Sequence, residues 1–313
     1  MHVNLIEPPE KRWLLTVTQK RHALELLNAY KADLGLSNSS TELLPAMARD
    51  IVDPLYWIEM ESIATQIGEP VESVVISNLY YDVFKSVIGC TAFAVDTPEG
   101  PLHARNMDWW TTDGILSRHT TTCHFTGAPA GEFTTIGWPG FVGAFSAIAP
   151  GRFAITLNAV LSLEKAVPAM PIVFLIRNTL ENAKCFEEAK YLLSETPIPC
   201  DCLLLLTGLK AGQLVVIERT PTRHAILDAV NGVISVTNNY QKMLTGNVTP
   251  DSELLKTSCS RFKRIQDLVS QRQPISAEAC LEHLSDPSVR MTITMQQMVF
   301  QASTGKHWLK LPE

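Results

Sequence analysis

The sequence lacks a basic run, a long apolar run and an N-terminal leader pattern. Its 26 Lys and Arg residues are outnumbered by 32 Asp and Glu, for a formal net charge of −6. No Lys/Arg-rich stretch occurs, which argues against nucleic acid as a partner. No apolar stretch is long enough to span a bilayer. The opening residues show no charged region followed by an apolar one, so we expect a cytoplasmic protein.

Metal-binding and disulfide patterns are also missing. The seven cysteines are an odd number in a chain of 313 residues, which is far too large to need disulfide staples. Cys200 and Cys202 are too closely spaced for a zinc pair and have no second pair elsewhere. We therefore expect reduced thiols, no metal and no cofactor.

What is present is an ordered series of helices and strands. Apolar residues at helical spacing predict an all-helical segment that ends near Lys85. Short strands with turn signals follow Cys90, then one long amphipathic helix over 171–195 and four strands over 202–239 spaced like an antiparallel meander. Two helices and a C-terminal hairpin complete the chain. This order predicts an α+β fold in which helical layers cover antiparallel sheet.

The first hairpin after the helical segment brings together three reactive side chains. A strong turn signal is centred on Pro98 and Glu99, and a hairpin with that centre places Cys90 opposite Met107. Arg105 and Asp108 then lie within a residue or two of the thiol. A neighbouring guanidinium favours the thiolate, which is the nucleophilic form of cysteine.

A nucleophilic cysteine needs a base, and no histidine is placed for that role. His103 shares a strand face with Arg105, and we interpret it as part of the sheet surface. If the Gly89–Cys90 bond is cut, however, Cys90 gains an α-amine with a pKa of roughly 7.7 to 8.0, which Asp108 is placed to orient. The competing interpretation is that Cys90 is a small buried apolar residue beside a local salt bridge.

Several motifs resemble one enzyme family. "GCTAFAV" and "HARNMDWW" resemble the start of the mature chain in acid ceramidase and N-acylethanolamine-hydrolysing acid amidase, which are N-terminal-nucleophile (Ntn) hydrolases related to choloylglycine hydrolases. "TTIGWPGFVGAFSAIAPGRFAITLN", the helix that begins "MPIVFLIRN", "SVTNNY" and "SCSRFKRIQ" are similar to further family motifs and follow in the same order. The resemblance covers nearly the whole chain.

The resemblance implies a four-layer αββα sandwich of antiparallel sheets over 90–313, preceded by a helical pro-segment over 1–89. It implies that the chain is a zymogen, which cuts itself before a nucleophilic cysteine. The residues that match the catalytic positions of the family are Cys90, Arg105, Asp108, Asn158, Asn238 and Arg261. Asn158 matches an oxyanion or substrate-positioning asparagine, and the Thr-Asn motif leaves open whether Asn238 or Asn239 is the equivalent residue.

The implied activity is hydrolysis of a linear amide through a thioester. The implied substrate is a small N-acyl amide that carries a lipid chain, such as an N-acylethanolamine or a ceramide, and the two segments are expected to stay associated after cleavage, with possible contact to a membrane surface. Two alternatives in the same class are a bile-salt or penicillin acylase and an amine acyltransferase. The alternative from another class is an uncleaved, inactive lipid-binding protein.

Overall fold

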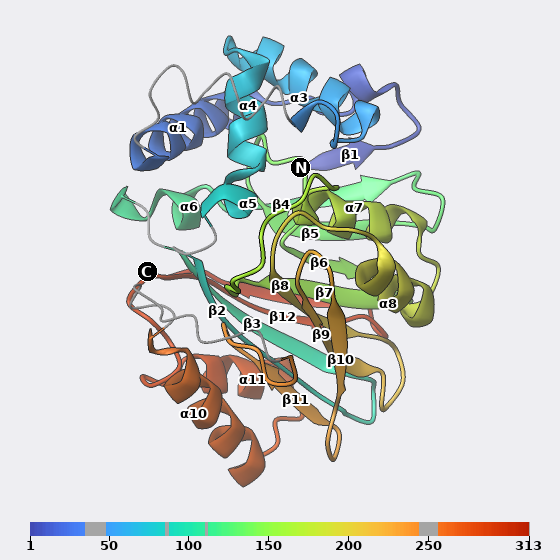
Figure 1. Cartoon of the computed structure of the whole chain (residues 1–313), viewed down its shortest axis with the longest axis vertical. Coiled ribbons are helices and arrows are strands. Elements are labelled where there is room, and N and C mark those ends of the chain that lie inside the picture. Colours follow the sequence, from blue (N-terminus) through green and yellow to red (C-terminus); the bar gives the residue numbers. More distant parts are fainter. Residues whose placement is uncertain (35–47, 85–87, 110–111, 244–255, 313) are drawn as a thin grey trace.

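A computed structural model describes residues 1–34, 48–84, 88–109, 112–243 and 256–312 (Figure 1). Its strands form two sheets. In spatial order, the eight-stranded sheet consists of β1 (His2–Asn4), β4 (Thr121–Thr126), β5 (Phe133–Gly137), β6 (Ser146–Ala149), β7 (Phe153–Asn158), β8 (Cys202–Thr207), β9 (Leu214–Arg219) and β10 (His224–Asp228). The five-stranded sheet consists of β11 (Val233–Val236), β2 (Ile88–Val95), β3 (Leu102–Trp109), β12 (Thr294–Gln301) and β13 (Lys306–Lys310).

The helices gather at both ends of the molecule and on its flank (Figure 1). Before Cys90 the helical elements are η1 (Pro9–Lys11), α1 (Val17–Leu34), α3 (Pro54–Ile67), α4 (Val71–Asn78) and α5 (Tyr80–Phe84). After Cys90 they are η3 (Thr112–Gly114), α6 (Ile115–Arg118), α7 (Ile172–Asn182), α8 (Phe186–Glu195), α10 (Ser258–Gln271) and α11 (Ala277–Leu284). Helices α10 and α11 contact the five-stranded sheet, and α8 contacts the eight-stranded sheet.

The two sheets pack face to face. Strand β2 contacts β7 and β8 across the interface, and β11 contacts β9. Strands β2 and β3 are buried along their whole length, as expected for strands covered by a second sheet on one side and by helices on the other. The predicted mixed α+β fold with packed sheets is therefore confirmed.

The prediction that the segment before Cys90 is all-helical is wrong at its start. Strand β1 pairs in parallel with β4, with Val3 beside Phe125, so the eight-stranded sheet is not purely antiparallel. Val3 is fully buried, and its burial rather than any local pattern accounts for the strand. A strand of three residues is too short to show a periodic pattern in the sequence. Lys85, where the helical segment was expected to end, lies outside the described residues.

The prediction of one long helix over 171–195 is also wrong, because the chain breaks into α7 and α8. Ala183 takes an extended conformation at the end of α7. The Arg152 guanidinium accounts for the break, since it donates to the carbonyls of Leu180 and Ala183 and satisfies the free helix end. The side chain of Glu188 accepts the Lys184 N–H and so helps to begin α8.

The predicted four-strand meander holds for three strands only. Strands β8, β9 and β10 pair in sequence as antiparallel neighbours. Strand β11 leaves this sheet and pairs with β2 in the other one, with Val236 opposite Ala92. This change of sheet brings the residues that follow β11 to the start of β2, where Cys90 lies.

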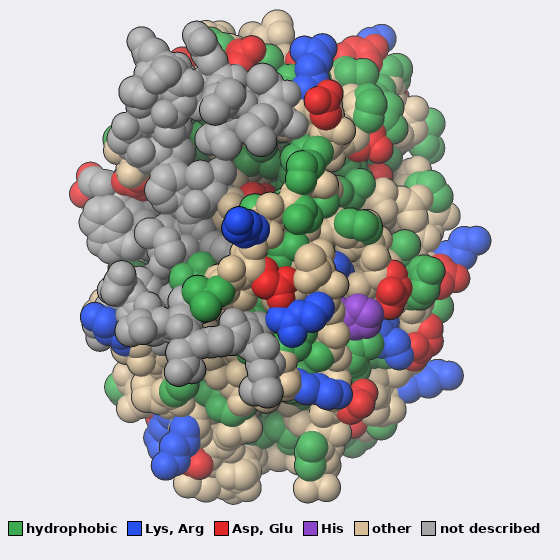
Figure 2. Space-filling model, viewed as in Figure 1, with side chains coloured by type: hydrophobic (Ala, Val, Ile, Leu, Met, Phe, Trp, Pro, Cys, Tyr) green, Lys and Arg blue, Asp and Glu red, His purple; other side chains and the backbone are tan. Residues whose placement is uncertain are grey.

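One apolar core joins the segments before and after Cys90. It contains Leu26 and Met60 from the helices before it, together with Trp138 and Phe174 from the chain after it. No helix within the described ranges is both long and apolar enough to cross a bilayer. On the face shown in Figure 2, acidic and basic side chains are interspersed over the described residues.

A buried ion pair ties the same two segments together. Glu59 of α3 accepts bonds from both terminal nitrogens of Arg177 of α7, and neither side chain is exposed to solvent. Arg12 and the Trp13 indole also donate to Glu59. Burial raises the pKa of Glu59, but the charge and hydrogen bonds of Arg177 outweigh it, so the net pKa lies below the ordinary value of 4.5.

We expect Glu59→Gln to lower the free energy of unfolding by about 3 kcal/mol, because it removes the fully buried carboxylate beside Arg177 and leaves that charge with the partly buried Glu181 alone among the described carboxylates. Urea denaturation at pH 7 measures the change. The matched control is Glu187→Gln, which breaks an exposed pair with Lys190 and should cost less than about 1 kcal/mol. Equal losses in the two variants would contradict the assigned role of the buried pair.

The difference in free energy of unfolding between the original chain and Glu59→Gln should depend on pH in one direction. A carboxyl whose pKa is lowered by folding contributes stability above its unfolded pKa, and that contribution is lost as the pH falls through the folded pKa. This stability difference should therefore be constant above about pH 5 and become smaller below about pH 4.5. Denaturation curves recorded from pH 7 down to pH 3 test this, and a gap that widens in acid contradicts it.

Candidate active site

The hairpin of β2 and β3 has the predicted register. Cys90 lies opposite Met107, and Gly89 lies opposite Asp108. Directly opposite residues of an antiparallel pair share a face, and faces alternate along each strand. Cys90 and Arg105 therefore point between the two sheets, whereas Asp108 points to the outer face, toward α10 and α11.

Arg105 is a fully buried guanidinium between the sheets. Its Nη2 donates to the Cys90 sulfur at 3.1 Å and to the Leu157 carbonyl, and its Nη1 donates to the Phe145 carbonyl and the Ser146 hydroxyl. In the described part of the chain no carboxylate forms an ion pair with it. A buried cation without an anion is costly, and the Cys90 sulfur is one of the four groups that Arg105 contacts.

Arg261 and Asn238 hold the backbone of Cys90. Arg261 reaches in from α10 and donates to the Cys90 carbonyl and the Thr91 hydroxyl, both at 2.7 Å. It also donates to Asn238 Oδ1 at 2.8 Å, and the same oxygen accepts the Cys90 N–H at 3.1 Å. These bonds fix the peptide unit of Cys90 on the side away from its thiol.

Asp108 is buried beside this clamp. Its Oδ1 accepts a hydrogen bond from Thr294, and its Oδ2 lies 3.8 Å from Arg261 Nη1 but accepts no hydrogen bond among the described residues. Burial raises the pKa of Asp108, while the charge of Arg261 and the Thr294 bond act in the opposite direction. The structure thus leaves one carboxylate oxygen available next to Gly89.

Asn158 lies at the end of β7 and bonds the end of β11 rather than the thiol. Its Nδ2 donates to the carbonyls of Val236 and Thr237, at 3.3 and 3.0 Å. Its Oδ1 is buried and accepts no hydrogen bond in the described ranges. Asn158 therefore ties β7 to the end of β11, and its unused atom is an acceptor rather than a donor.

The structure separates the two asparagines of the Thr-Asn motif. Asn238 contacts Cys90 and Arg261, whereas Asn239 Oδ1 accepts the hydroxyls of Thr237 and Ser258 instead. Ser258 in turn accepts the Asn238 N–H. The geometry favours Asn238 as the residue that acts on Cys90.

His103 does not lie in position to act as a base. Its ring is fully buried between the hydroxyls of Thr156 and Thr207, at 2.8 and 3.1 Å. Burial and the charge of Arg105 lower its pKa to about 3. The imidazole is neutral and fills the space between the sheets.

Two further residues of the site carry no signal in the sequence. Thr294 of β12 donates a hydrogen bond to Asp108, and Ser146 of β6 accepts one from Arg105. Both partners are distant in sequence from the residues they contact. No local motif marks them, and only the register of β12 against β3 and the packing of the two sheets reveal their roles.

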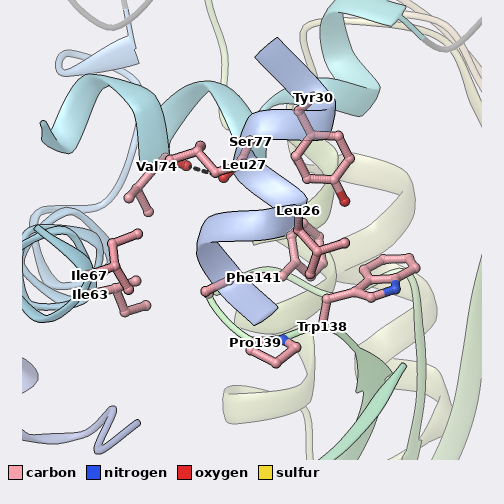
Figure 3. Close-up of a pocket in the computed structure, with 12 residues that line it drawn as sticks. Leu26, Leu27, Tyr30, Ile63, Ile67, Val74, Ser77, Trp138, Pro139 and Phe141 are labelled. Carbon is pink, nitrogen blue, oxygen red and sulfur yellow. Dashed lines mark hydrogen bonds between the residues drawn. The ribbon is translucent and has the colours of Figure 1, made fainter. Parts of the chain in front are cut away.

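Two cavities lie near the site. One is apolar and lies between α1, α3, α4 and the turn after β5, with Leu26, Tyr30, Ile63, Trp138 and Phe141 in its lining (Figure 3). Its volume of about 20 Å³ holds a single water molecule. The other, of about 520 Å³, is lined by residues that include Trp109, Arg118, Thr294 and Met295, and so begins next to Asp108.

An aromatic cluster connects the apolar cavity with the thiol. Trp109 packs against Tyr30, Tyr80, Trp138 and Phe145, with ring centroids 5.0 to 6.1 Å apart. The carbonyl of Phe145 is one of the groups that hold Arg105. The surroundings of Cys90 are thus apolar on the side of the helices that precede it.

The chain is similar to known proteins both in sequence and in fold. Residues 95–303 match the family "Acyl-coenzyme A:6-aminopenicillanic acid acyl-transferase". The match begins five residues after Cys90 and includes the other five candidate residues. The structure is similar to an N-acylethanolamine-hydrolyzing acid amidase ortholog from Caenorhabditis elegans, with a TM-score of 0.58 and 20% identity over 71% of this chain and 100% of that one.

Curated relatives carry the name acid ceramidase. The chain is 28% identical to the protein of Balaenoptera acutorostrata scammoni over 249 residues, which are 69% of this chain and 62% of that protein. It is 26% identical to the protein of Rattus norvegicus over 319 residues, 92% of this chain and 76% of that one. In the first of these comparisons the chain spans about three fifths of the relative's length. By the family match over residues 95–303, the chain belongs to the acyl-coenzyme A:6-aminopenicillanic acid acyl-transferase family.

Proposed function

We propose that the chain is a self-activating Ntn amidase that cleaves a linear N-acyl amide. In this proposal residues 1–89 are a pro-segment, residues 90–313 form the αββα catalytic domain, and Cys90 is the nucleophile. The observation that carries the proposal is the 3.1 Å contact between Arg105 and the Cys90 sulfur, made by a guanidinium that has no carboxylate partner among the described residues.

Activation begins with attack of the Cys90 thiolate on the Gly89 carbonyl. The carbon–sulfur bond forms, the Gly89–Cys90 peptide bond breaks, and the nitrogen takes up a proton to become a free α-amine. Water then opens the thioester, which releases the Gly89 carboxylate and restores the thiol. Gly89 has no side chain, so the carbonyl is open to attack.

The new α-amine serves as the base in each later turnover. Its reference pKa of roughly 7.7 to 8.0 lets it accept and return a proton near neutral pH. The Asp108 oxygen that accepts no hydrogen bond lies next to Gly89 in register, and we assign it the role of orienting the amine. Asn238 Oδ1 already accepts from the same nitrogen in the uncut chain.

Asn238 also has a donor for the oxyanion that forms when the thiolate attacks. Its Nδ2 carries two protons, and one of them is donated to the Ala159 carbonyl at 2.8 Å. The second proton is available to the developing charge, where a side-chain amide donor is worth a few kcal/mol. Asn158 acts indirectly, because it fixes the end of β11 from which Asn238 projects.

The substrate is assigned as an amide with a long acyl chain. Trp109 lies on the same strand face as the thiol and packs against Trp138, which lines the small cavity, and the curated relatives are named acid ceramidase. A cavity of about 20 Å³ is too small for an acyl chain, so cleavage has to widen it. The shared core and the Glu59–Arg177 pair keep the two fragments together during that change.

Transfer of the acyl group to an amine is a second candidate, because the matched family is described as an acyl-transferase. The thioester is the same in both reactions, and the acceptor alone differs. With hydroxylamine or ethanolamine added to the assay, a hydrolase yields chiefly free acid and an acyltransferase yields chiefly the new amide.

Self-cleavage provides the first test. We expect purified chain to convert into two fragments whose masses correspond to 1–89 and 90–313, and we expect Cys90→Ala to stay whole. Intact-mass analysis after incubation from pH 4 to pH 8 measures both. An original chain that stays whole at every pH, or a Cys90→Ala chain that still divides, contradicts the proposal.

The substrate class has its own test. We expect the cleaved protein to hydrolyse acyl-ethanolamides or ceramides faster than conjugated bile salts or penicillin V, because apolar aromatic side chains border the thiol. Release of free acid from each compound measures the preference. Faster cleavage of bile salts or penicillin V overturns the lipid assignment but leaves amide hydrolysis intact.

The two asparagines of the Thr-Asn motif are expected to differ. Asn238→Leu removes the group that holds the Cys90 N–H and should slow self-cleavage about 100-fold or more, on the order found for loss of one preorganised donor. Asn239→Leu should slow it less than about tenfold, since Asn239 reaches Cys90 only through Ser258 and Asn238. Fragment appearance over time measures both rates, and the opposite ranking assigns the role to Asn239.

A further inference from the structure

A buried carboxylate on β9 is bonded by backbone groups rather than by a cation. Glu218 is 1% exposed, and it forms no ion pair with a basic side chain in the described part of the chain. Its two oxygens accept the N–H groups of three consecutive residues, Gln241, Lys242 and Met243, at 2.5 to 3.2 Å. Burial of a carboxylate without a cation is costly, so these bonds need an explanation beyond packing.

The segment that Glu218 holds has little structure of its own. Residues 239–243 form neither a helix nor a strand, and none of their backbone groups bonds the backbone of another described residue. The other bond to β9 comes from Tyr240, whose hydroxyl donates to the Arg219 carbonyl at 2.7 Å. The path of this segment is therefore set from β9, mostly by one carboxylate.

The same segment follows directly after Asn238, whose Oδ1 accepts the Cys90 N–H at 3.1 Å. On its N-terminal side Asn238 is fixed by Ser258 of α10, which accepts its N–H at 2.8 Å. On its C-terminal side the chain is fixed to β9 by Glu218. Asn238 thus lies between two anchors on different elements, and a change at either anchor shifts its side chain relative to Cys90.

We propose that Glu218 is a positioning residue, whose carboxylate shapes residues 241–243 so that the Asn238 side chain meets the Cys90 N–H. The inference rests on the amidase function proposed above. The described hydrogen bonds of the Glu218 carboxylate all go to the 241–243 backbone, so its effect on the thiol has to pass through Asn238. Displacement of a positioning group by about 1 Å can slow a reaction about 100-fold.

The test is a double-mutant cycle on the rate of self-cleavage. Glu218→Gln keeps one accepting oxygen but replaces the other with an NH2 group, which cannot accept a hydrogen bond. We expect it to slow fragment appearance about tenfold in the original chain. In an Asn238→Leu background the positioned group is gone, so we expect less than about a twofold further change. A residue that only stabilises the fold would have the same effect in both backgrounds.

The matched control is Asp96→Asn. Asp96 also accepts a backbone N–H, from Gly212 at 3.0 Å, but it lies just beyond the end of β2 that is distant from Cys90. Its rate of self-cleavage should stay within about twofold of the original. All rates are measured at a temperature at which circular dichroism shows each variant to be fully folded, so that a loss of stability does not enter the comparison.

Glu218→Asp keeps two accepting oxygens, placed one carbon closer to β9, and should slow cleavage less than Glu218→Gln with the same dependence on Asn238. It takes the place of Glu218→Gln in the cycle if that variant does not fold. The inference is overturned if the variant used cleaves at the original rate, or if it slows cleavage equally in both backgrounds. Failure of the amidase proposal looks different, because the original chain then stays whole at every pH and the inference falls with it.

Discussion

The site depends on one buried positive charge. Arg105 projects from the five-stranded sheet into the interface and donates to backbone and hydroxyl groups of the eight-stranded sheet and to the Cys90 sulfur. The nearby carboxylate of Asp108 faces the other way and lies beside Arg261 instead. Carbonyl groups satisfy the hydrogen bonds of a guanidinium but not its full charge. A guanidinium aimed at the sulfur at 3.1 Å is what the proposed nucleophile calls for, and an ordinary packing interpretation of Cys90 does not require it.

The same constraint explains why the surrounding structure is tightly fixed. The Arg105 bonds to Phe145, Ser146 and Leu157 connect two sheets whose strands come from distant parts of the chain. The apolar core and the Glu59–Arg177 pair extend that connection to the helices before Cys90. Hydrolysis of one peptide bond in such a body removes one covalent link but few of the contacts that hold the fold. This is the physical reason to expect that the two fragments of the proposed cleavage stay associated.

The sequence predicts local features of this fold well and distant ones poorly. The centre of the turn at Pro98 and Glu99 was sufficient to place Cys90 opposite Met107, because hairpin register follows from turn position. The pairing of β1 with β4 and the transfer of β11 to the second sheet depend on packing between distant segments. The break between α7 and α8 depends on Arg152, which no local pattern connects with that helix.

The candidate site also has parts that the sequence predicts and parts that depend on contacts between distant segments. The six residues came from motifs in family order, and the structure brings five of them together around the Cys90 backbone and thiol. Asn158 is turned toward β11, and its donors are already used. Thr294 and Glu218 were not foreseen, because only contacts between distant segments bring them to the site.

The placement of groups on the two faces also explains why a terminal amine suits this site as the base. The thiol of Cys90 points between the sheets, whereas Asp108 and Arg261 lie on the outer face. A histidine side chain would have to share the inner face with the thiol, and the one histidine there, His103, is held neutral between two threonines. The nitrogen of Cys90 is part of the backbone and so lies in the plane of the sheet. If the Gly89–Cys90 bond is cut as proposed, this nitrogen becomes an amine that is adjacent to the thiol on one side and faces the Asp108 carboxylate on the other.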